Sequence, residues 1–256
     1  MDPRALQLSA RAAEHLRAAL FLILPAASAL ALPAAAAEGD PEPPVSIGAL
    51  RAAAGERVDH GTADDGAVWS RAASYRAGFE RGGTSFVPFL GSRAPRNFPV
   101  RFRLESIARG GAAVAFDADV APERTEDTVH FARGGVVEVY ELRPAQVEQL
   151  FVLGALPAAG GDLVLSIGVD TELEGGTTAD GIEFRNTLGA VRYGAAVAID
   201  ATGRRVEAPT AYADGAIEIR VPGAWLAHAR MPLTIDPVIS TFAVDATTED
   251  DFAPAS

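Results

Sequence analysis

Carboxylate side chains are the residues of this sequence that most favour a binding chemistry, because they gather in three short acidic groups. Several oxygens that converge on one point can hold Ca²⁺, and loops of this kind bind it weakly. None of the groups has the spacing of a D-x-[DN]-x-[DN]-G calcium loop. The alternative is that the carboxylates lie in solvated turns and keep an acidic protein soluble. The candidate calcium ligands are Asp117, Asp119, Asp170, Glu172, Glu174 and Asp180, with Glu123, Glu126 and Asp127 beside the first pair and a third group at Glu249, Asp250 and Asp251.

The nucleophiles, bases and other metal ligands show no catalytic spacing. His60, His130 and His228 are far apart, and the sequence contains no HExxH or HxH arrangement of a zinc enzyme. It lacks the G-x-S-x-G elbow, the P-loop and the G-x-G-x-x-G turn, and it has no Cys for a thiol nucleophile, a disulfide or a thiolate metal site. We therefore assign no catalytic residue. We expect His130 to be a partly exposed strand residue and His228 to lie on the surface of a helical turn.

Four aromatic side chains would form a sugar-stacking platform if the fold placed them together. These are Trp69, Tyr75, Tyr193 and Trp225. They are widely separated, and aromatic residues make up only 7% of the chain, so we expect each of them to pack in the core or to cap a sheet. Five phenylalanines on candidate strands are also expected in the core, namely Phe98, Phe102, Phe116, Phe131 and Phe151.

The overall charge limits the partners of this protein. The chain has 256 residues, with 22 basic and 34 acidic side chains and a formal net charge of −12. Nucleic-acid binding depends on Lys and Arg side chains that displace counterions from phosphates, so we expect no nucleic-acid partner. Hydrophobic residues make up 48% of the chain, which is enough to bury the core of one sizeable domain or of two small ones.

Alternating apolar and polar residues predict many short strands after residue 98. In the clearest case, Ile217, Ile219 and Val221 would face a core while Glu218 and Arg220 face solvent. Turns rich in Gly and Asp separate these runs, which favours antiparallel hairpins over parallel βαβ units. We predict an all-β fold, an antiparallel β-sandwich or open barrel, with helical turns only at 144–150 and 222–229. The predicted strands are 100–107, 113–116, 128–132, 136–142, 148–153, 163–169, 182–186, 190–193, 196–200, 210–212, 216–221 and 233–235.

The N-terminus has the pattern of a signal peptide. Residues 1–17 are polar and contain arginines, an apolar run follows from Ala18, and Ala35 and Ala37 fit the A-x-A requirement of a signal peptidase. We expect a signal helix within residues 1–37, cleavage after Ala37, and a secreted, periplasmic or cell-surface protein. The alternative is a leader that is retained as a membrane anchor, since residues 18–37 are about long enough to cross a bilayer.

Three further regions follow the leader. Residues 38–97 are predicted to be a linker and an irregular segment, 98–240 a β-sandwich module, and 241–256 an acidic, disordered tail. Near the end of the module, Pro232 and Pro237 lack a backbone donor, so we expect the strand between them at a sheet edge or a domain exit. Asp236 would then accept backbone N–H groups in an Asx-type turn, with a catalytic or calcium-binding role as the alternative.

Four stretches resemble the N-terminal β-rich module of large bacterial secreted or cell-surface proteins, in which the module precedes β-propeller or other β repeats. The most specific stretch is Pro232-Leu233-Thr234-Ile235-Asp236-Pro237-Val238-Ile239-Ser240, preceded by Val221-Pro222, because in similar proteins a segment of this kind closes the module. The resemblance implies further repeat domains of a larger surface protein as partners, and it implies no catalytic residues. The other stretches are 147–151, 161–165, and 182–185 continuing to 191–200.

Together these observations favour an exported, non-enzymatic structural or adhesive β module at the bacterial cell surface. The alternative is a glycan- or calcium-binding module, and a third hypothesis is an exported hydrolase whose site has no sequence signature. We expect no cofactor apart from the Ca²⁺ of the second hypothesis, no nucleic-acid partner, and membrane contact only through an uncleaved leader.

Overall fold

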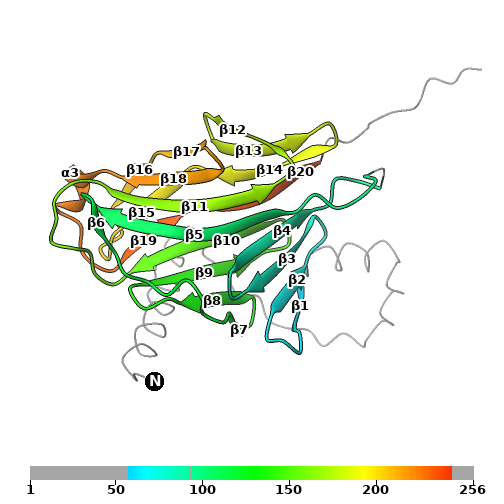
Figure 1. The fold of residues 1–256 in the computed structure, drawn as a ribbon, viewed down its shortest axis with the longest axis horizontal. Coiled ribbons are helices and arrows are strands. Elements are labelled where there is room, and N and C mark those ends of the chain that lie inside the picture. The colour runs from blue at the N-terminus through cyan, green and yellow to red at the C-terminus, as the bar shows by residue number, and fades with distance from the viewer. Residues whose placement is uncertain (1–56, 93, 244–256) are drawn as a thin grey trace, which may run out of the picture. The chain divides into compact units, whose positions relative to one another are not determined.

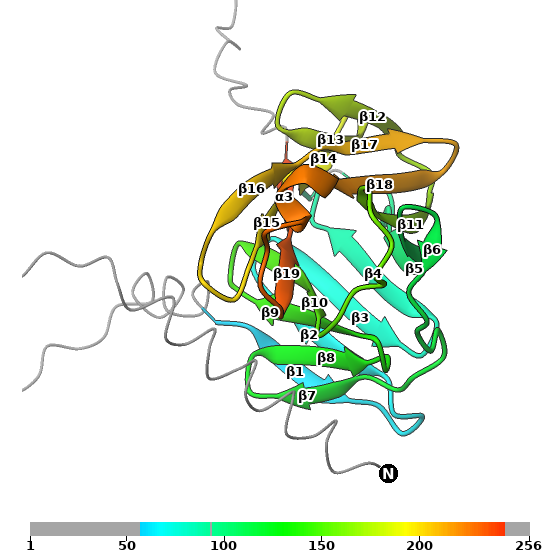
Figure 2. The same cartoon turned by 90° about the vertical axis from the view of Figure 1, so that its left-hand side faces the viewer.

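Two antiparallel sheets that pack face to face make up the described part of the chain (Figure 1). The computed structural model describes residues 57–92 and 94–243. Figure 2, turned by 90°, shows the two layers from the end of the sandwich. The single helix within the described residues is the one-turn α3 (Gly223–Leu226), inside the predicted helical segment 222–229. The predicted all-β fold is therefore confirmed, and it is a β-sandwich.

The first sheet joins the first five strands of the described chain to a hairpin that comes late in the sequence. Its order is β1-β2-β3-β4-β5-β11-β18-β17, and β6 pairs with the end of β5. Its members are β1 (Asp59–Thr62), β2 (Val68–Arg71), β3 (Tyr75–Glu80), β4 (Gly83–Pro88), β5 (Val100–Arg109), β6 (Ala112–Ala113), β11 (Leu163–Thr171), β17 (Thr210–Ala213) and β18 (Ala216–Val221).

The second sheet is built around β10, which pairs with β9 on one edge and with β19 and β20 on the other. The order is β12-β13-β14-β20-β10-β19-β15-β16, and β9, β8 and β7 extend it from the other edge of β10. Its members are β7 (Glu123–Thr125), β8 (Thr128–Ala132), β9 (Val136–Leu142), β10 (Gln146–Leu153), β12 (Glu174–Thr178), β13 (Gly181–Asn186), β14 (Gly189–Gly194), β15 (Ala196–Ile199), β16 (Arg205–Ala208), β19 (Leu233–Asp236) and β20 (Val238–Ala243).

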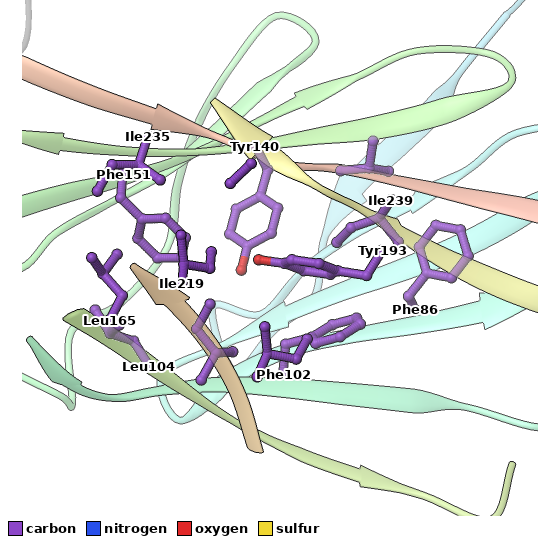
Figure 3. Packing of buried hydrophobic residues seen from close by; sticks show 14 of the residues in the cluster. Phe86, Phe102, Leu104, Tyr140, Phe151, Leu165, Tyr193, Ile219, Ile235 and Ile239 are labelled. Atoms are coloured by element: carbon purple, nitrogen blue, oxygen red, sulfur yellow. The ribbon is translucent and has the colours of Figure 1, made fainter. Parts of the chain in front are cut away.

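One hydrophobic core lies between the sheets, because both sheets turn an alternating apolar face inward (Figure 3). Phe86 and Phe102 contribute from the first sheet, and Tyr140, Phe151 and Tyr193 from the second; each is at most 2% exposed. The rings of Phe102 and Tyr193 lie 5.5 Å apart between centroids, so aromatic packing ties the two layers together. Figure 3 also shows the hydroxyl groups of Tyr140 and Tyr193 directed toward each other inside this core.

The structure of residues 59–88 differs from the predicted domain organisation. They form β1 to β4, so the prediction of an irregular segment is wrong there, and β4 pairs with β5 across the predicted boundary. On β3, Tyr75, Ala77 and Phe79 point inward, but the small Ala77 and Gly78 hide this alternation in the sequence. The helical turn predicted at 144–150 is also wrong, because Gln146–Leu153 is β10 and its residues 147–153 pair with β9.

The strand between the two prolines is not at a sheet edge. β19 and β20 lie one after the other along β10. On their other side, β19 pairs with β15 and β20 pairs with β14. Pro237 falls at the break between them, where its carbonyl accepts a hydrogen bond from the Gln149 N–H at 3.0 Å. A proline is tolerated inside the sheet here because the ladder needs no donor at the break.

The predicted signal helix with Ala35 and Ala37, residues 38–56 of the predicted linker and residues 244–256 of the predicted tail lie outside the described residues. Residues 241–243 belong to β20, so the sheet extends beyond the predicted start of the tail. Within the described ranges, no helix is long and apolar enough to cross a bilayer.

Candidate functional site

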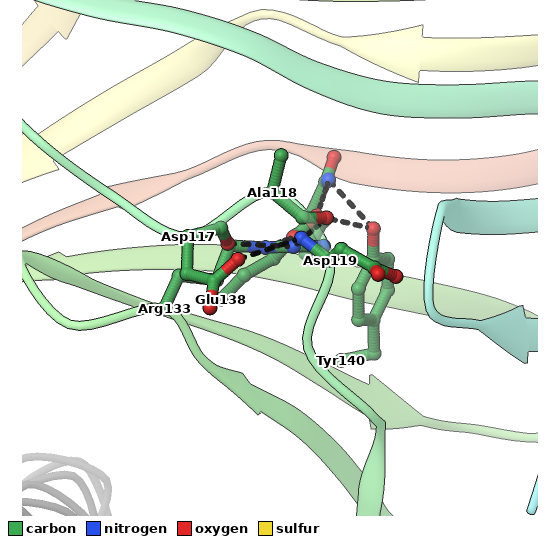
Figure 4. Close-up of polar contacts among 7 residues, drawn as sticks. Asp117, Ala118, Asp119, Arg133, Glu138 and Tyr140 are labelled. Atoms are coloured by element: carbon green, nitrogen blue, oxygen red, sulfur yellow. Dashed lines mark hydrogen bonds and ion pairs between the residues drawn. The ribbon is translucent and has the colours of Figure 1, made fainter.

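A network of buried polar and charged side chains surrounds Glu138 in the interior of the sandwich (Figure 4). Glu138 occupies an inward position of β9, between Val136 and Tyr140, and is only 3% exposed. Its Oε2 accepts a hydrogen bond from Arg133 Nε at 2.8 Å. Its Oε1 accepts hydrogen bonds from the Tyr140 hydroxyl at 2.6 Å and from Gln149 Nε2 at 2.9 Å. Both carboxylate oxygens of this buried group are therefore satisfied.

This network continues in two directions from Glu138. Toward β14, the Tyr193 hydroxyl donates to Gln149 Oε1 at 2.8 Å. Toward the surface, Arg133 Nη1 donates to the carbonyls of Asp117 and Ala118, at 3.2 and 2.8 Å. The buried ion pair thus holds the segment between β6 and β7 against the end of the β8–β9 hairpin.

The surroundings keep the two tyrosines of this network protonated, so that their hydroxyl groups act as hydrogen-bond donors. Burial, and then the charge of Glu138, raises the pKa of Tyr140 well above its usual value. The same two causes raise the pKa of Tyr193. Both phenols remain protonated at neutral pH and keep their hydrogen bonds to the network. The arrangement stabilises a charge inside the core, and its groups are too deeply buried to meet a substrate.

Asp200 is a second saturated carboxylate, in the turn between β15 and β16. Its Oδ1 accepts hydrogen bonds from the N–H and hydroxyl of Thr202 and from the N–H of Arg204, and its Oδ2 accepts one from the N–H of Arg230. Burial raises the pKa of Asp200, but these hydrogen bonds outweigh it and lower the pKa to about 2. The carboxylate therefore joins two separate stretches of backbone.

Asp236 lies on the outward face of the second sheet, and its hydrogen bonding differs from that of Glu138 and Asp200. Its Oδ1 is buried without a hydrogen-bond partner, and no backbone N–H of the described residues donates to it, so the predicted Asx-type turn is wrong. Burial, then the charges of Glu148 and Glu141, raises the pKa of Asp236 to about 6, against the weaker opposing effects of Arg205 and Arg143. Asp236 thus titrates well above the range of an ordinary aspartate.

Arg143 holds the two glutamates next to Asp236. Its Nη2 donates to Glu141 Oε2 and to Glu148 Oε2, at 2.9 Å in each case. Burial, and then the charge of Glu148, raises the pKa of Glu141. Three carboxylates and one guanidinium therefore share a small area, but these groups do not form a set of ligands that could hold a metal ion.

The predicted calcium ligands are dispersed. Asp117 Oδ1 accepts a hydrogen bond from the Asp119 N–H at 3.0 Å, and Asp170 pairs with Arg101 at 3.3 Å. Across residues 57–92 and 94–243, no group of three or more His, Asp or Glu side chains is arranged to hold a metal ion, so calcium binding stays a prediction. The remaining candidates are Glu172, which pairs with Arg96, Glu174 at the start of β12, and Asp180 in the β12–β13 turn.

The histidines occupy separate places at the surface. His130 on β8 is partly exposed, as predicted, and its Nε2 lies 3.3 Å from Glu123 Oε2 on the neighbouring β7. His60 on β1 contacts Asp127 at 3.1 Å, and so connects the two sheets at one end. His228 follows α3 and contacts the carbonyl of Ala224 at 3.3 Å.

The four aromatic residues do not form one platform. Tyr75 and Tyr193 are fully buried, and Trp225 packs partly against the core, as expected. Trp69 is different, because 46% of its surface is exposed on the outer face of β2. The expectation that Trp69 packs in the core or caps a sheet is therefore wrong. Of the predicted core phenylalanines, three are buried and Phe98 and Phe116 are partly buried.

Sequence reasoning missed the network around Glu138, although one signal was present. Glu138 stands at an inward position of the alternating run Val136, Glu138, Tyr140 and Leu142, where a charged side chain needs a partner. The partners could not be read from the sequence, because Gln149 reaches Glu138 only through the pairing of β9 with β10.

Comparisons with protein-family models, with curated proteins and with solved structures found no match to this chain. The resemblance to modules of bacterial surface proteins therefore stays a prediction from the sequence.

Proposed function

We propose that this chain is an exported, non-enzymatic structural or adhesive module at the bacterial cell surface, which holds or presents further repeat domains. The signal-peptide pattern before residue 38 and the closing segment at 232–240 support the export and the surface location. The fold supports the structural part of the proposal, and the argument depends on how its core and its last strand are held.

The observation that carries the proposal is the single core shared by both sheets and reinforced by buried polar contacts. Arg133 and Glu138 tie a long connecting segment to the second sheet. The Tyr75 hydroxyl of the first sheet donates to the Arg143 carbonyl of the second at 2.9 Å. Satisfied buried contacts of this kind favour one well-defined packing of the layers. The sandwich is thus suited to remain folded as a unit.

The last described strand is placed to carry a load. β20 (Val238–Ala243) lies between β10 and β14 and is hydrogen-bonded to both. A force applied to the chain beyond β20 acts along this strand, so it must shear two ladders of hydrogen bonds together. An edge strand could instead be peeled from one neighbour at a time.

The test of the structural role is a single-molecule pulling experiment on the full chain held at both ends. Because β1 is an edge strand and can detach first, the proposal predicts that the remaining strands, from β2 to β20, unfold in one cooperative step. Separate unfolding of the two sheets at low force would contradict it. For the export, the full chain is produced in a bacterium, and a surface or secreted form that begins at Glu38 is expected. Retention of the whole chain in the cytoplasm would overturn that part.

A further inference from the structure

Trp69 is a large aromatic side chain that lies exposed on the outer face of the first sheet. Val68 and Ser70 of β2 point inward, which turns Trp69 to the outer face of the first sheet. Its indole covers the backbone of the neighbouring β1, since a Cβ at Gly61 would lie 2.8–3.0 Å from three atoms of the ring. The sheet therefore supports the ring from below, and nearly half of the side chain remains exposed to solvent.

The row of residues beside Trp69 is flat. Across the strands, Trp69 stands opposite Gly78 of β3, Gly78 opposite Ser85 of β4, and Ser85 opposite Arg101 of β5. No side chain larger than Ser85 rises between Trp69 and Arg101 in this row. Gly78 therefore leaves the β3 position beside the indole without a side chain, between Arg76 and Glu80 on the same face.

An open groove of about 510 Å³ adjoins this aromatic surface. Arg71, which follows Trp69 by two residues on the same face of β2 and so lies about 7 Å along it, lines the groove together with Arg76 and Arg96. Phe89 lies under the guanidinium of Arg76, at 5.7 Å from its ring centroid. Ser92 and Asn97 contribute the other polar side chains of the groove.

Two of these arginines are placed in a way that favours an anion. Arg71 and Arg76 are direct cross-strand neighbours, and like charges in such positions repel each other. Within the described part of the chain neither forms an ion pair with a carboxylate, although Asp59 is the cross-strand neighbour of Arg71 on β1. Arg96 is already paired with Glu172. In a protein with a net charge of −12, this is a local cationic site beside an exposed indole.

We propose that the surface formed by Trp69, Arg71 and Arg76 binds an acidic glycan. The apolar C–H face of a pyranose packs on the indole, and the carboxylate of an adjacent uronic acid accepts hydrogen bonds from the two guanidinium groups. The indole and the guanidinium of Arg71 project from strand positions about 7 Å apart on the same face of β2. This binding goes beyond the structural role proposed above and does not depend on it.

The experiment titrates the full chain with uronic-acid oligosaccharides, from galacturonan and from alginate, and with neutral galactose oligomers of equal length. Calorimetry is expected to show saturable binding of at least one acidic series, at least ten times tighter than the neutral series and weakened by salt. Trp69→Ala and the double variant Arg71→Gln/Arg76→Gln should each weaken this binding at least ten-fold, whereas Trp69→Tyr should retain most of it.

The matched control is Arg103→Gln, which removes an exposed arginine from the same outer face, two residues beyond Arg101. Its affinity should equal that of the wild type, and thermal melts should show that every variant is folded. The proposal is overturned if neither acidic series binds, if the neutral series binds equally well, or if Trp69→Ala leaves the affinity unchanged. Equally tight binding of single-stranded DNA or of anionic phospholipid vesicles would also overturn it.

Discussion

The second sheet carries a partly or fully buried carboxylate on each of its two faces, and the surroundings of the two differ. On the inner face, Glu138 receives hydrogen bonds on both oxygens from Arg133, Tyr140 and Gln149. On the outer face, Asp236 has a buried oxygen without a partner, and burial next to two glutamates raises its pKa to about 6. Burial disfavours the charged form of both carboxylates, and the hydrogen-bond donors around each one decide whether that cost is offset.

The largest effect is expected from breaking the interior ion pair. Arg133→Met leaves Glu138 buried without its cation and frees the carbonyls of Asp117 and Ala118, so the free energy of unfolding should fall by about 3–5 kcal/mol in urea denaturation. The double variant Arg133→Met/Glu138→Leu is the control, because it removes both charges and should recover a large part of this loss. A loss below about 1 kcal/mol in the single variant would show that the pair is not buried as described.

A smaller loss is expected at Asp200, the other saturated carboxylate. Asp200→Ala removes the acceptor of three backbone N–H groups and one hydroxyl in a buried turn, which should cost roughly 2–3 kcal/mol in the same measurement. Because the pKa of Asp200 is lowered to about 2, its stabilising contribution is present above pH 4 and is lost as the pH falls toward 2. The variant should therefore lose less stability than the wild type in strong acid. If both lose the same amount, the turn does not depend on the carboxylate.

Asp236 is expected to behave in the opposite way. Its pKa is raised from an ordinary 3.8 to about 6, so the folded state binds the proton more tightly than the unfolded state. The stability that this provides is present below pH 4 and is lost as the pH rises to 6. Asp236→Asn should therefore raise the free energy of unfolding by roughly 1–2 kcal/mol at pH 7, a value reduced for the partial exposure of the group, and by almost nothing at pH 3.5. A pH-independent difference between variant and wild type would refute this explanation.

The smallest effect is expected where both partners are exposed. Arg101 and Asp170 lie 3.3 Å apart on the outer face of the first sheet, with side chains 61% and 79% exposed. Asp170→Asn should change the free energy of unfolding by less than about 0.5 kcal/mol, and less still in high salt. A loss of stability comparable to that of Asp200→Ala would mean that solvent exposure does not explain how much Asp170 and Asp200 each contribute to stability.

The regular part of this fold could be predicted from the sequence because β-branched and aromatic residues alternate there without interruption. β18 is the clearest example, with Ile217, Ile219 and Val221 inward as expected. The strands between 59 and 80 could not be recognised in this way, since Gly61 and Gly78 interrupt the pattern and the inward positions 70 and 77 hold only Ser and Ala.

The candidate sites depend on contacts between distant segments, and these cannot be read from local patterns. The sequence singled out Asp236, but its surroundings come from Glu141 and Glu148 on other strands. Trp69 follows the inward Val68, and only the pairing of β2 shows which of these two apolar neighbours faces solvent. The sheet-edge prediction for residues 233–235 was wrong because a break at Pro237 lets a proline occupy an interior position.

One matched pair of substitutions compares the two faces of the second sheet most directly. Glu138→Gln and Asp236→Asn each convert a carboxylate into an amide of nearly the same shape, and the free energy of unfolding of both variants is measured at pH 7. We expect opposite signs, with a loss of at least about 2 kcal/mol for Glu138→Gln and a gain for Asp236→Asn. Changes of the same sign would contradict the view that the donors around each carboxylate determine what it contributes.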